Sequence, residues 1–191
     1  FIVRRLFSEL AYRDAEEATI DRLVGVWDSS GHSIREVVRA ILVSDEFYSR
    51  RAYRSLVRSP VEFAVGAVRA LEVETDWLGI ERAAAAMDQR LFEPPNVAGW
   101  PGGETWLSSS SFFGRLNFLD TTLFPAGRAI AIPALAGAAS PEAIVDEALK
   151  RLVDDNITPE SRESLYAYAR TVTDPQERAA AVAYLVLAIP E

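Results

Sequence analysis

The fold class is decided by the stretch Ser59-Pro60-Val61-Glu62, which has the pattern of a helix start and recurs along the chain. Proline suits the first helical position, where its missing N–H loses no hydrogen bond and its fixed φ already matches the helix. Three further starts share the pattern: Ser140-Pro141-Glu142, Thr158-Pro159-Glu160 and Asp174-Pro175-Gln176-Glu177. Each start leads into an amphipathic stretch, so the sequence predicts a helix at each of them.

Apolar residues also recur at helical spacing outside these segments. In residues 2–10 and 20–27 they fall three and four positions apart, and Ser33 with Glu36 forms a capping box before another such stretch. Residues 77–91 indicate a further helix, whose alanine run lets a neighbouring helix approach closely. No convincing strand alternation appears. The sequence therefore predicts an all-α fold, an irregular bundle of about 8–9 helices with a long ordered loop rich in proline, glycine and tryptophan.

Domain organisation is indicated by one change in composition. Residues 124–139 are rich in alanine, glycine and proline, which is typical of a connecting segment. We expect a helical lobe at 1–128 that contains the long loop. A C-terminal helical hairpin or triplet at 129–191 is expected to pack on that lobe as one unit.

Composition and charge exclude several classes of function. The formal net charge of −8 gives an acidic surface that repels nucleic acid phosphates, so we expect no nucleic acid partner. There is no cysteine and a single histidine, which excludes thiolate and multi-histidine zinc sites, and we expect no metal and no cofactor. The longest apolar run, 179–189, is much shorter than the ~20 residues that cross a bilayer, so no membrane span is expected. Nothing in the sequence indicates an oligomeric state.

Four arginines cluster in the first third of the chain. If their segment is helical, they line one face, because residues four apart are neighbours on a helix. A solvated face that pairs with nearby carboxylates is the preferred interpretation, and an anion or phosphate site is the alternative. The four are Arg50, Arg51, Arg54 and Arg58.

The most distinctive segment is Leu91-Phe92-Glu93-Pro94-Pro95-Asn96-Val97-Ala98-Gly99-Trp100-Pro101-Gly102-Gly103-Glu104-Thr105-Trp106-Leu107. Its prolines and glycines cannot continue a helix, so it is a loop. Exposing both tryptophans to water would forgo the free energy gained by burying their large apolar side chains. We therefore expect Trp100 or Trp106 to anchor the loop on the helices.

This loop resembles the bacterial family known as domain of unknown function 1800. The resemblance extends to Trp106-Leu107-Ser108-Ser109, Arg115-Leu116-Asn117-Phe118, Leu42-Val43-Ser44-Asp45-Glu46-Phe47 and Phe1-Ile2-Val3-Arg4-Arg5-Leu6, and covers most of the chain as the C-terminal half of that family. It implies an exported, extracytoplasmic bacterial protein, often encoded beside a sulfatase-like protein, and provides no catalytic residues. The chain also opens inside an amphipathic segment without an initiator methionine, so we expect upstream sequence.

Isolated polar residues favour structural roles. His32 lies at a helix junction without an identifiable partner, so a structural or solvated histidine is preferred to a general base. Asp154, Asp155, Asn156 and Glu160 are rich in oxygen but lack the alternating ligands of a calcium loop, so capping explains them better.

The preferred hypothesis is a binding or scaffolding module without its own catalytic centre. Any protein or glycan ligand is expected at the loop, through Asn96, Gly99, Trp100, Trp106, Glu93 and Glu104. The alternative is a hydrolase, or an accessory part of one, that acts on carbohydrate or cell-envelope polymer. In it Glu93 and Glu104 act as acid and base, and the tryptophans form a sugar platform. In a third hypothesis the chemistry belongs to an upstream half of the protein.

Overall fold

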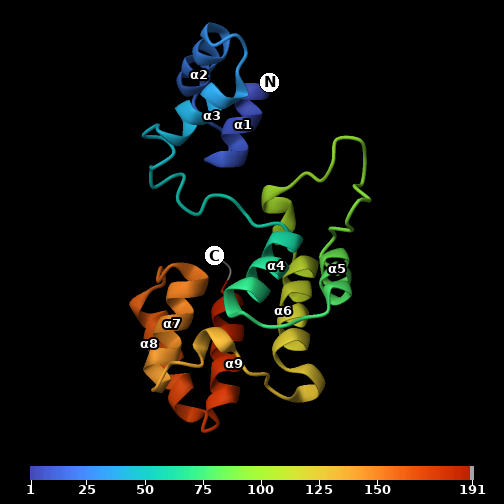
Figure 1. The fold of residues 1–191 in the computed structure, drawn as a ribbon, viewed down its shortest axis with the longest axis vertical. Coiled ribbons are helices and arrows are strands. Elements are labelled where there is room, and N and C mark those ends of the chain that lie inside the picture. Colours follow the sequence, from blue (N-terminus) through green and yellow to red (C-terminus); the bar gives the residue numbers. More distant parts are fainter. Residues whose placement is uncertain (190–191) are drawn as a thin grey trace. The chain divides into compact units, whose positions relative to one another are not determined.

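The computed structural model describes residues 1–189 as helices joined by turns and loops (Figure 1). Those residues form nine α-helices and three short 3-10 helices, without a β-strand. The predicted all-α class is therefore confirmed. The helices belong to two compact units, Phe1–Val57 and Arg58–Glu191. Along the described residues, no helix has the length and apolar character that crossing a membrane requires.

The first unit is a three-helix cluster of α1 (Ile2–Leu10), α2 (Glu17–Ser29) and α3 (Ile34–Leu42), each of which packs on the other two. Ser33 caps α3 by accepting a hydrogen bond from the backbone N–H of Glu36 at 3.4 Å. The predicted helical periodicity places apolar residues of all three helices inside. The buried core consists of Val3, Phe7, Ala11, Tyr12, Ile20, Leu23, Val37 and Ile41.

The segment 43–59 that holds the arginine cluster consists of turns, not helix, so its arginines share no helical face. Arg51 reaches back to the connection between α1 and α2. Its guanidinium is ion-paired with Glu16, donates to the carbonyl of Asp14 at 2.7 Å and lies 4.3 Å above the ring of Tyr12. For Arg51 the structure therefore supports the carboxylate-pairing interpretation.

The second unit begins with α4 (Pro60–Leu71), α5 (Trp77–Ala86) and α6 (Ser109–Leu123), which pack against one another. The start of α4 has the complete capping box. Ser59 Oγ accepts from the backbone N–H of Glu62 at 3.4 Å, and the Glu62 carboxylate accepts from the backbone N–H of Ser59 at 2.8 Å. Gly114 lets α6 approach α5 closely, because a Cβ there would lie 2.6 Å from Cγ of the buried Met87.

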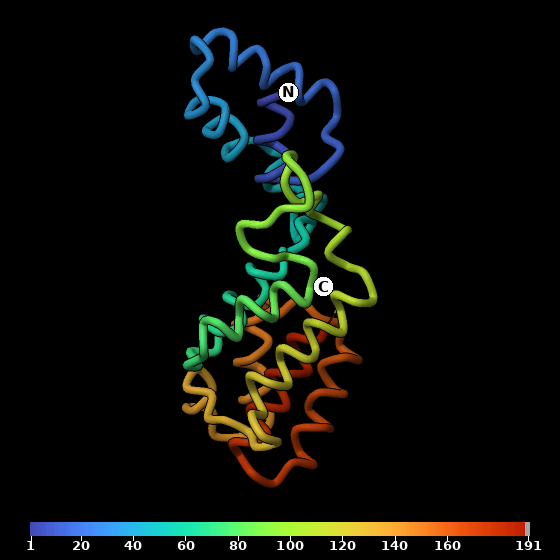
Figure 2. Tube along the Cα trace, turned by 90° about the vertical axis from the view of Figure 1, so that its right-hand side faces the viewer, coloured from blue at the N-terminus to red at the C-terminus, as the bar shows by residue number. Residues whose placement is uncertain are grey.

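The remaining helices are α7 (Pro141–Val153), α8 (Pro159–Thr171) and α9 (Pro175–Leu187), and all three begin at the prolines that the sequence indicated. Helix α7 packs on α8 and α9, and α9 also packs on α6, as Figure 2 shows. One apolar core joins these helices to α4 and α6, with Leu71, Leu119, Leu123, Leu149 and Val182 almost fully buried.

Residues 124–139 pack into the second unit. They form two 3-10 helices, Pro125–Gly127 and Pro133–Leu135, and Leu135 is buried in the core. Gln176 of α9 donates to the carbonyl of Ala129 at 2.6 Å. The boundary between the two compact units falls between Val57 and Arg58 in the chain, whereas the sequence placed a domain division at 128/129. The domain division at 128/129 stays a prediction.

Candidate functional site

The long loop leaves α5, projects beyond the ends of α5 and α6, and returns through a 3-10 helix, Gly103–Leu107 (Figure 1). Its return is fixed by Trp106, whose side chain is only 6% exposed. Ser111 in the first turn of α6 donates to the Trp106 carbonyl at 2.5 Å, and Ser108 caps that helix by accepting from the backbone N–H of Ser111. The expectation that one tryptophan anchors the loop is thus confirmed for Trp106, while Trp100 is half-buried.

The tip of the loop is shaped by Asn96. Its side-chain Oδ1 accepts from the backbone N–H of Ala98 at 2.8 Å, and its carbonyl accepts from the N–H of Gly99 at 3.1 Å. This is an Asx turn closed by a backbone turn, which asparagine favours. Gly99 supplies the positive φ of +86° that the reversal needs. The Asn96 acceptor groups are therefore used within the loop.

The two candidate carboxylates are both exposed. Glu93 lies 3.4 Å from Nε of Arg90 in a surface ion pair. Glu104 lies in the first turn of the 3-10 helix. Among residues 1–189 no hydrogen bond joins the two glutamates, and neither of them lines a groove described below. The structure thus places neither glutamate in either of those two grooves.

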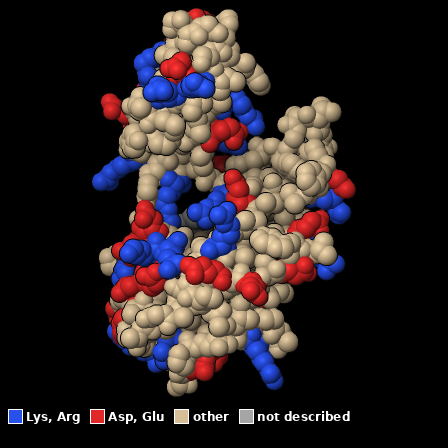
Figure 3. All heavy atoms as spheres, in the orientation of Figure 1, with Lys and Arg blue, Asp and Glu red and all other residues tan. Residues whose placement is uncertain are grey.

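Apolar side chains are the loop's exposed feature, and the sequence hypothesis did not single them out. Phe92 is 95% exposed, and Val97 is fully exposed. Phe92 also has a φ of +64°, in the left-handed region that a bulky aromatic residue rarely adopts. The projecting loop is largely uncharged on the face drawn in Figure 3, whereas acidic and basic groups mingle over the helices. Leu107 and Phe113, at the base of the loop, are also exposed.

Two grooves lie elsewhere. One of about 570 Å³ runs between α6, α8 and α9, with Phe124, Leu165, Tyr168, Tyr184 and Leu185 among its lining residues. The other, of about 390 Å³, lies in the first unit and is lined by Leu10, Phe47, Tyr48, Tyr53 and Leu56 among others. Both linings are mainly apolar, and the sequence hypothesis included neither.

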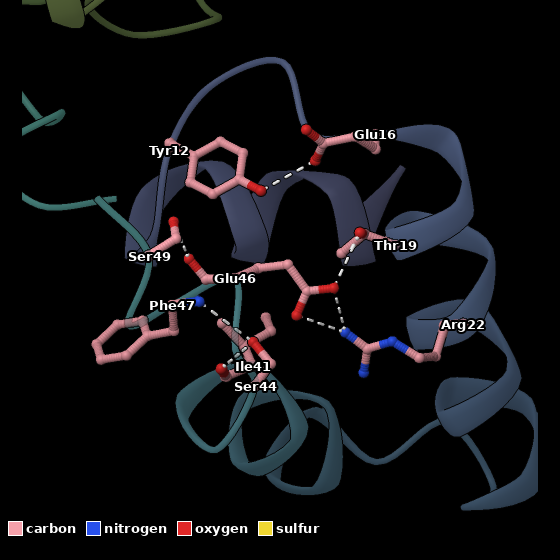
Figure 4. Close-up of polar contacts among 9 residues, drawn as sticks. All are labelled: Tyr12, Glu16, Thr19, Arg22, Ile41, Ser44, Glu46, Phe47 and Ser49. Atoms are coloured by element: carbon pink, nitrogen blue, oxygen red, sulfur yellow. Dashed lines mark hydrogen bonds and ion pairs between the residues drawn. The ribbon is translucent and has the colours of Figure 1, made fainter. Parts of the chain in front are cut away.

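A polar network in the first unit centres on Glu46 (Figure 4). Both carboxylate oxygens of Glu46 accept from Nη2 of Arg22 at 2.9 Å, and Thr19 donates to Oε1 at 3.1 Å. Hydrogen bonding from its own backbone N–H, together with Arg22 and Thr19, lowers the pKa of Glu46 to about 2. Because these bonds join α2 to the turns after α3, the network is structural.

The neighbouring hydroxyls in Figure 4 also hold local backbone. Tyr12 donates to Glu16 at 2.9 Å, and burial together with this bond raises the pKa of the Tyr12 phenol. Ser44 donates to the carbonyl of Ile41 at 2.8 Å, and Ser49 donates to that of Glu46 at 2.7 Å. These three hydroxyls therefore stabilise the connection between α1 and α2 and the turns after α3.

The remaining polar candidates lie on the surface. His32 has a φ of +66°, and its Nε2 lies 3.7 Å from Oδ1 of Asp28. Asp154 ends α7 in the left-handed conformation, and Asp155 is ion-paired with Arg162 at 2.5 Å. Nowhere in residues 1–189 do three or more His, Cys, Asp or Glu side chains form a group that suits a metal ion.

Sequence reasoning missed one further group. Arg115 on α6 is half-buried, and its Nε has no hydrogen-bond partner. Its neighbour is Arg58, whose carbonyl accepts from Nη2 of Arg115 at 2.9 Å. Arg58 belonged to the arginine cluster noted in the sequence, but nothing in the spacing linked it to a residue 57 positions away.

Together these features define an all-helical protein whose distinguishing element is an anchored loop with exposed apolar side chains. The chain belongs to the family described as protein of unknown function (DUF1800), whose model matches residues 1–191. No curated protein and no solved structure matches the chain.

Proposed function

We propose that the chain is a binding module and that the loop 91–107 docks an apolar surface of a partner protein. Phe92 carries the proposal, because its ring is 95% exposed and its backbone is in the left-handed region. Each feature costs free energy, and no contact within the described residues offsets the cost. Strained, exposed residues of this kind concentrate at functional sites. A partner that covers the Phe92 ring would gain the free energy of burying that ring as part of the binding energy.

The anchoring of the loop supports this function. Trp106 fixes one end in the fold, and the Asn96 turn shapes the tip, so the exposed side chains are presented on ordered backbone. Presenting them in advance lowers the entropy lost on binding. A protein surface fits them better than a glycan does, because the buried Trp106 offers no face to a sugar ring and the Asn96 oxygens are already bonded.

Site-specific photo-crosslinking in the full-length protein tests this function. A photoreactive residue is placed at Phe92 or Val97 and, as a control, at Leu78, an exposed apolar residue at the start of α5. The expected result is one discrete protein adduct from both loop positions and none from position 78. The purified partner should then bind Phe92→Ser at least about tenfold more weakly, whereas Leu78→Ser binds as the wild type does. Equal labelling at all three positions contradicts the proposal.

The hydrolase remains the competing hypothesis, with Glu93 and Glu104 as its carboxylates. It predicts cleavage of a glycan or cell-envelope polymer by the full-length protein, abolished by Glu93→Gln or Glu104→Gln without loss of stability. The binding module predicts no such turnover. We also propose an extracytoplasmic location, which rests on family resemblance and is tested by fractionation of the native host.

A further inference from the structure

Neither Arg58 nor Arg115 is ion-paired with a carboxylate within residues 1–189. By contrast, Arg151 bonds two glutamates and Arg162 bonds two aspartates. Positive charge at Arg58 and Arg115 is thus uncompensated in a chain whose net charge is −8.

Both guanidinium groups lie along one face of α4. Cζ of Arg115 is 4.7 Å from the centre of the Phe63 ring, and Nη1 of Arg58 is 3.7 Å from where a Cβ on Gly66 would lie. Positions 63 and 66 are three apart and therefore neighbours on the helix surface. A Cβ at Gly66 would make only ordinary van der Waals contact with Nη1, so the Arg58 guanidinium lies against the helix surface at this position.

The environment of Arg115 is unfavourable for a cation. Burial, and then the nearby charge of Arg58, lowers the pKa of the Arg115 guanidinium, and no carboxylate opposes the effect. Its Nε is buried without a partner, while Nη1 makes no hydrogen bond within the described residues and is not buried. Like charges held together in a partly desolvated place are stabilised by an anion that bridges them.

Nearby donors and acceptors are already satisfied, which leaves the two arginines as the open groups. Ser59 and Glu62 bond each other in the capping box, and the backbone N–H of Val61 donates to Oε1 of Gln89 at 2.9 Å. The start of α4 therefore has its caps, and the Glu62 carboxylate is engaged.

We propose that Arg58 and Arg115 form a binding site for a phosphate group. The planar guanidinium fork matches the oxygens of a phosphate, and two such groups match its charge of about −2 better than that of a monoanion. This site is separate from the protein contact proposed for Phe92, so either can fail without the other.

Titration calorimetry of the full-length protein with inorganic phosphate, at constant ionic strength, tests the site. Wild type is expected to bind with a stoichiometry of one. Arg58→Gln and Arg115→Gln should each weaken binding at least about tenfold, the loss of one charge-assisted contact. Arg82→Gln on α5 removes an equal charge from an exposed arginine and should leave the affinity within about twofold. Circular dichroism verifies that each variant is folded. If Arg115→Gln does not fold, the affinity of Arg58→Gln alone decides the test.

Three further ligands identify the chemical source. Glycerol 3-phosphate that binds more tightly than inorganic phosphate assigns the site to a phosphomonoester, and equal binding assigns it to free phosphate. Dimethyl phosphate, a monoanion, should bind more weakly than either. The proposal is overturned if wild type binds neither phosphate nor the monoester, if succinate binds more tightly than both, or if Arg58→Gln binds as Arg82→Gln does.

Discussion

Two aromatic residues of the same loop should respond to substitution in opposite directions. Trp106 is 6% exposed, so Trp106→Ala removes a buried side chain that typically covers about 200 Å², or about 5 kcal/mol at ~25 cal/mol per Å². That area is an upper bound, and Trp106 lies outside the two main cores, so we expect a loss of about 3 kcal/mol. Phe92→Gly removes an exposed ring and relieves a left-handed backbone, so stability should rise by up to about 1 kcal/mol.

Urea unfolding followed by circular dichroism measures both changes. The wild-type chain is the reference, and Leu78→Gly is unsuitable as a control because it lies inside a helix. Leu78→Ala, an exposed apolar truncation, should stay within about 0.5 kcal/mol of wild type. The interpretation of the loop is refuted if Phe92→Gly destabilises the protein by more than about 1 kcal/mol or if Trp106→Ala leaves it unchanged.

The other predictions concern packing, pH and unit boundaries. Gly114→Ala should lower the free energy of unfolding by about 1–2 kcal/mol, because its Cβ would lie 2.6 Å from Met87 Cγ. Gly66→Ala, whose Cβ makes only ordinary contact, should raise the free energy of unfolding by about 0.5–1 kcal/mol. Thermal unfolding of both variants compares the two effects. The pKa of Glu46 is lowered to about 2, so its charged form contributes stability that is present above pH 4.5 and lost as pH falls toward 2. In urea unfolding curves taken across this pH range, Glu46→Gln should remove about 2 kcal/mol of the pH dependence of the free energy of unfolding. An unchanged pH profile in this variant would contradict the lowered pKa. A fragment 58–191 should be helical and unfold cooperatively, because its core comes entirely from that range, and a disordered fragment by circular dichroism would refute the unit boundary.

Helix positions were predictable because local chemistry determines them. Pro60, Pro141, Pro159 and Pro175 each begin a helix, since a residue with fixed φ and no N–H fits only the first turn. The segment around Arg51 was harder to predict, because apolar spacing alone does not distinguish a helix from successive turns. The boundary between the two units in the chain depends on the long-range packing within each unit, which composition does not reveal.

The candidate site was only partly predictable. Burial of a loop tryptophan follows from its size, and Trp106 shows it. Exposure of Phe92 runs against the usual preference of aromatic residues, so no local rule indicates it. The approach of Arg115 to Arg58 arises from the packing of α6 on α4, which residue spacing within either helix does not report.

The binding-loop proposal is tested most directly by amide hydrogen exchange of the full-length protein, measured with and without the purified partner that the crosslinking identifies. We predict that complex formation protects amides of residues 92–99 and leaves the groove between α6, α8 and α9 unchanged. Protection at that groove, with the loop exchanging as fast as in the free protein, would contradict it.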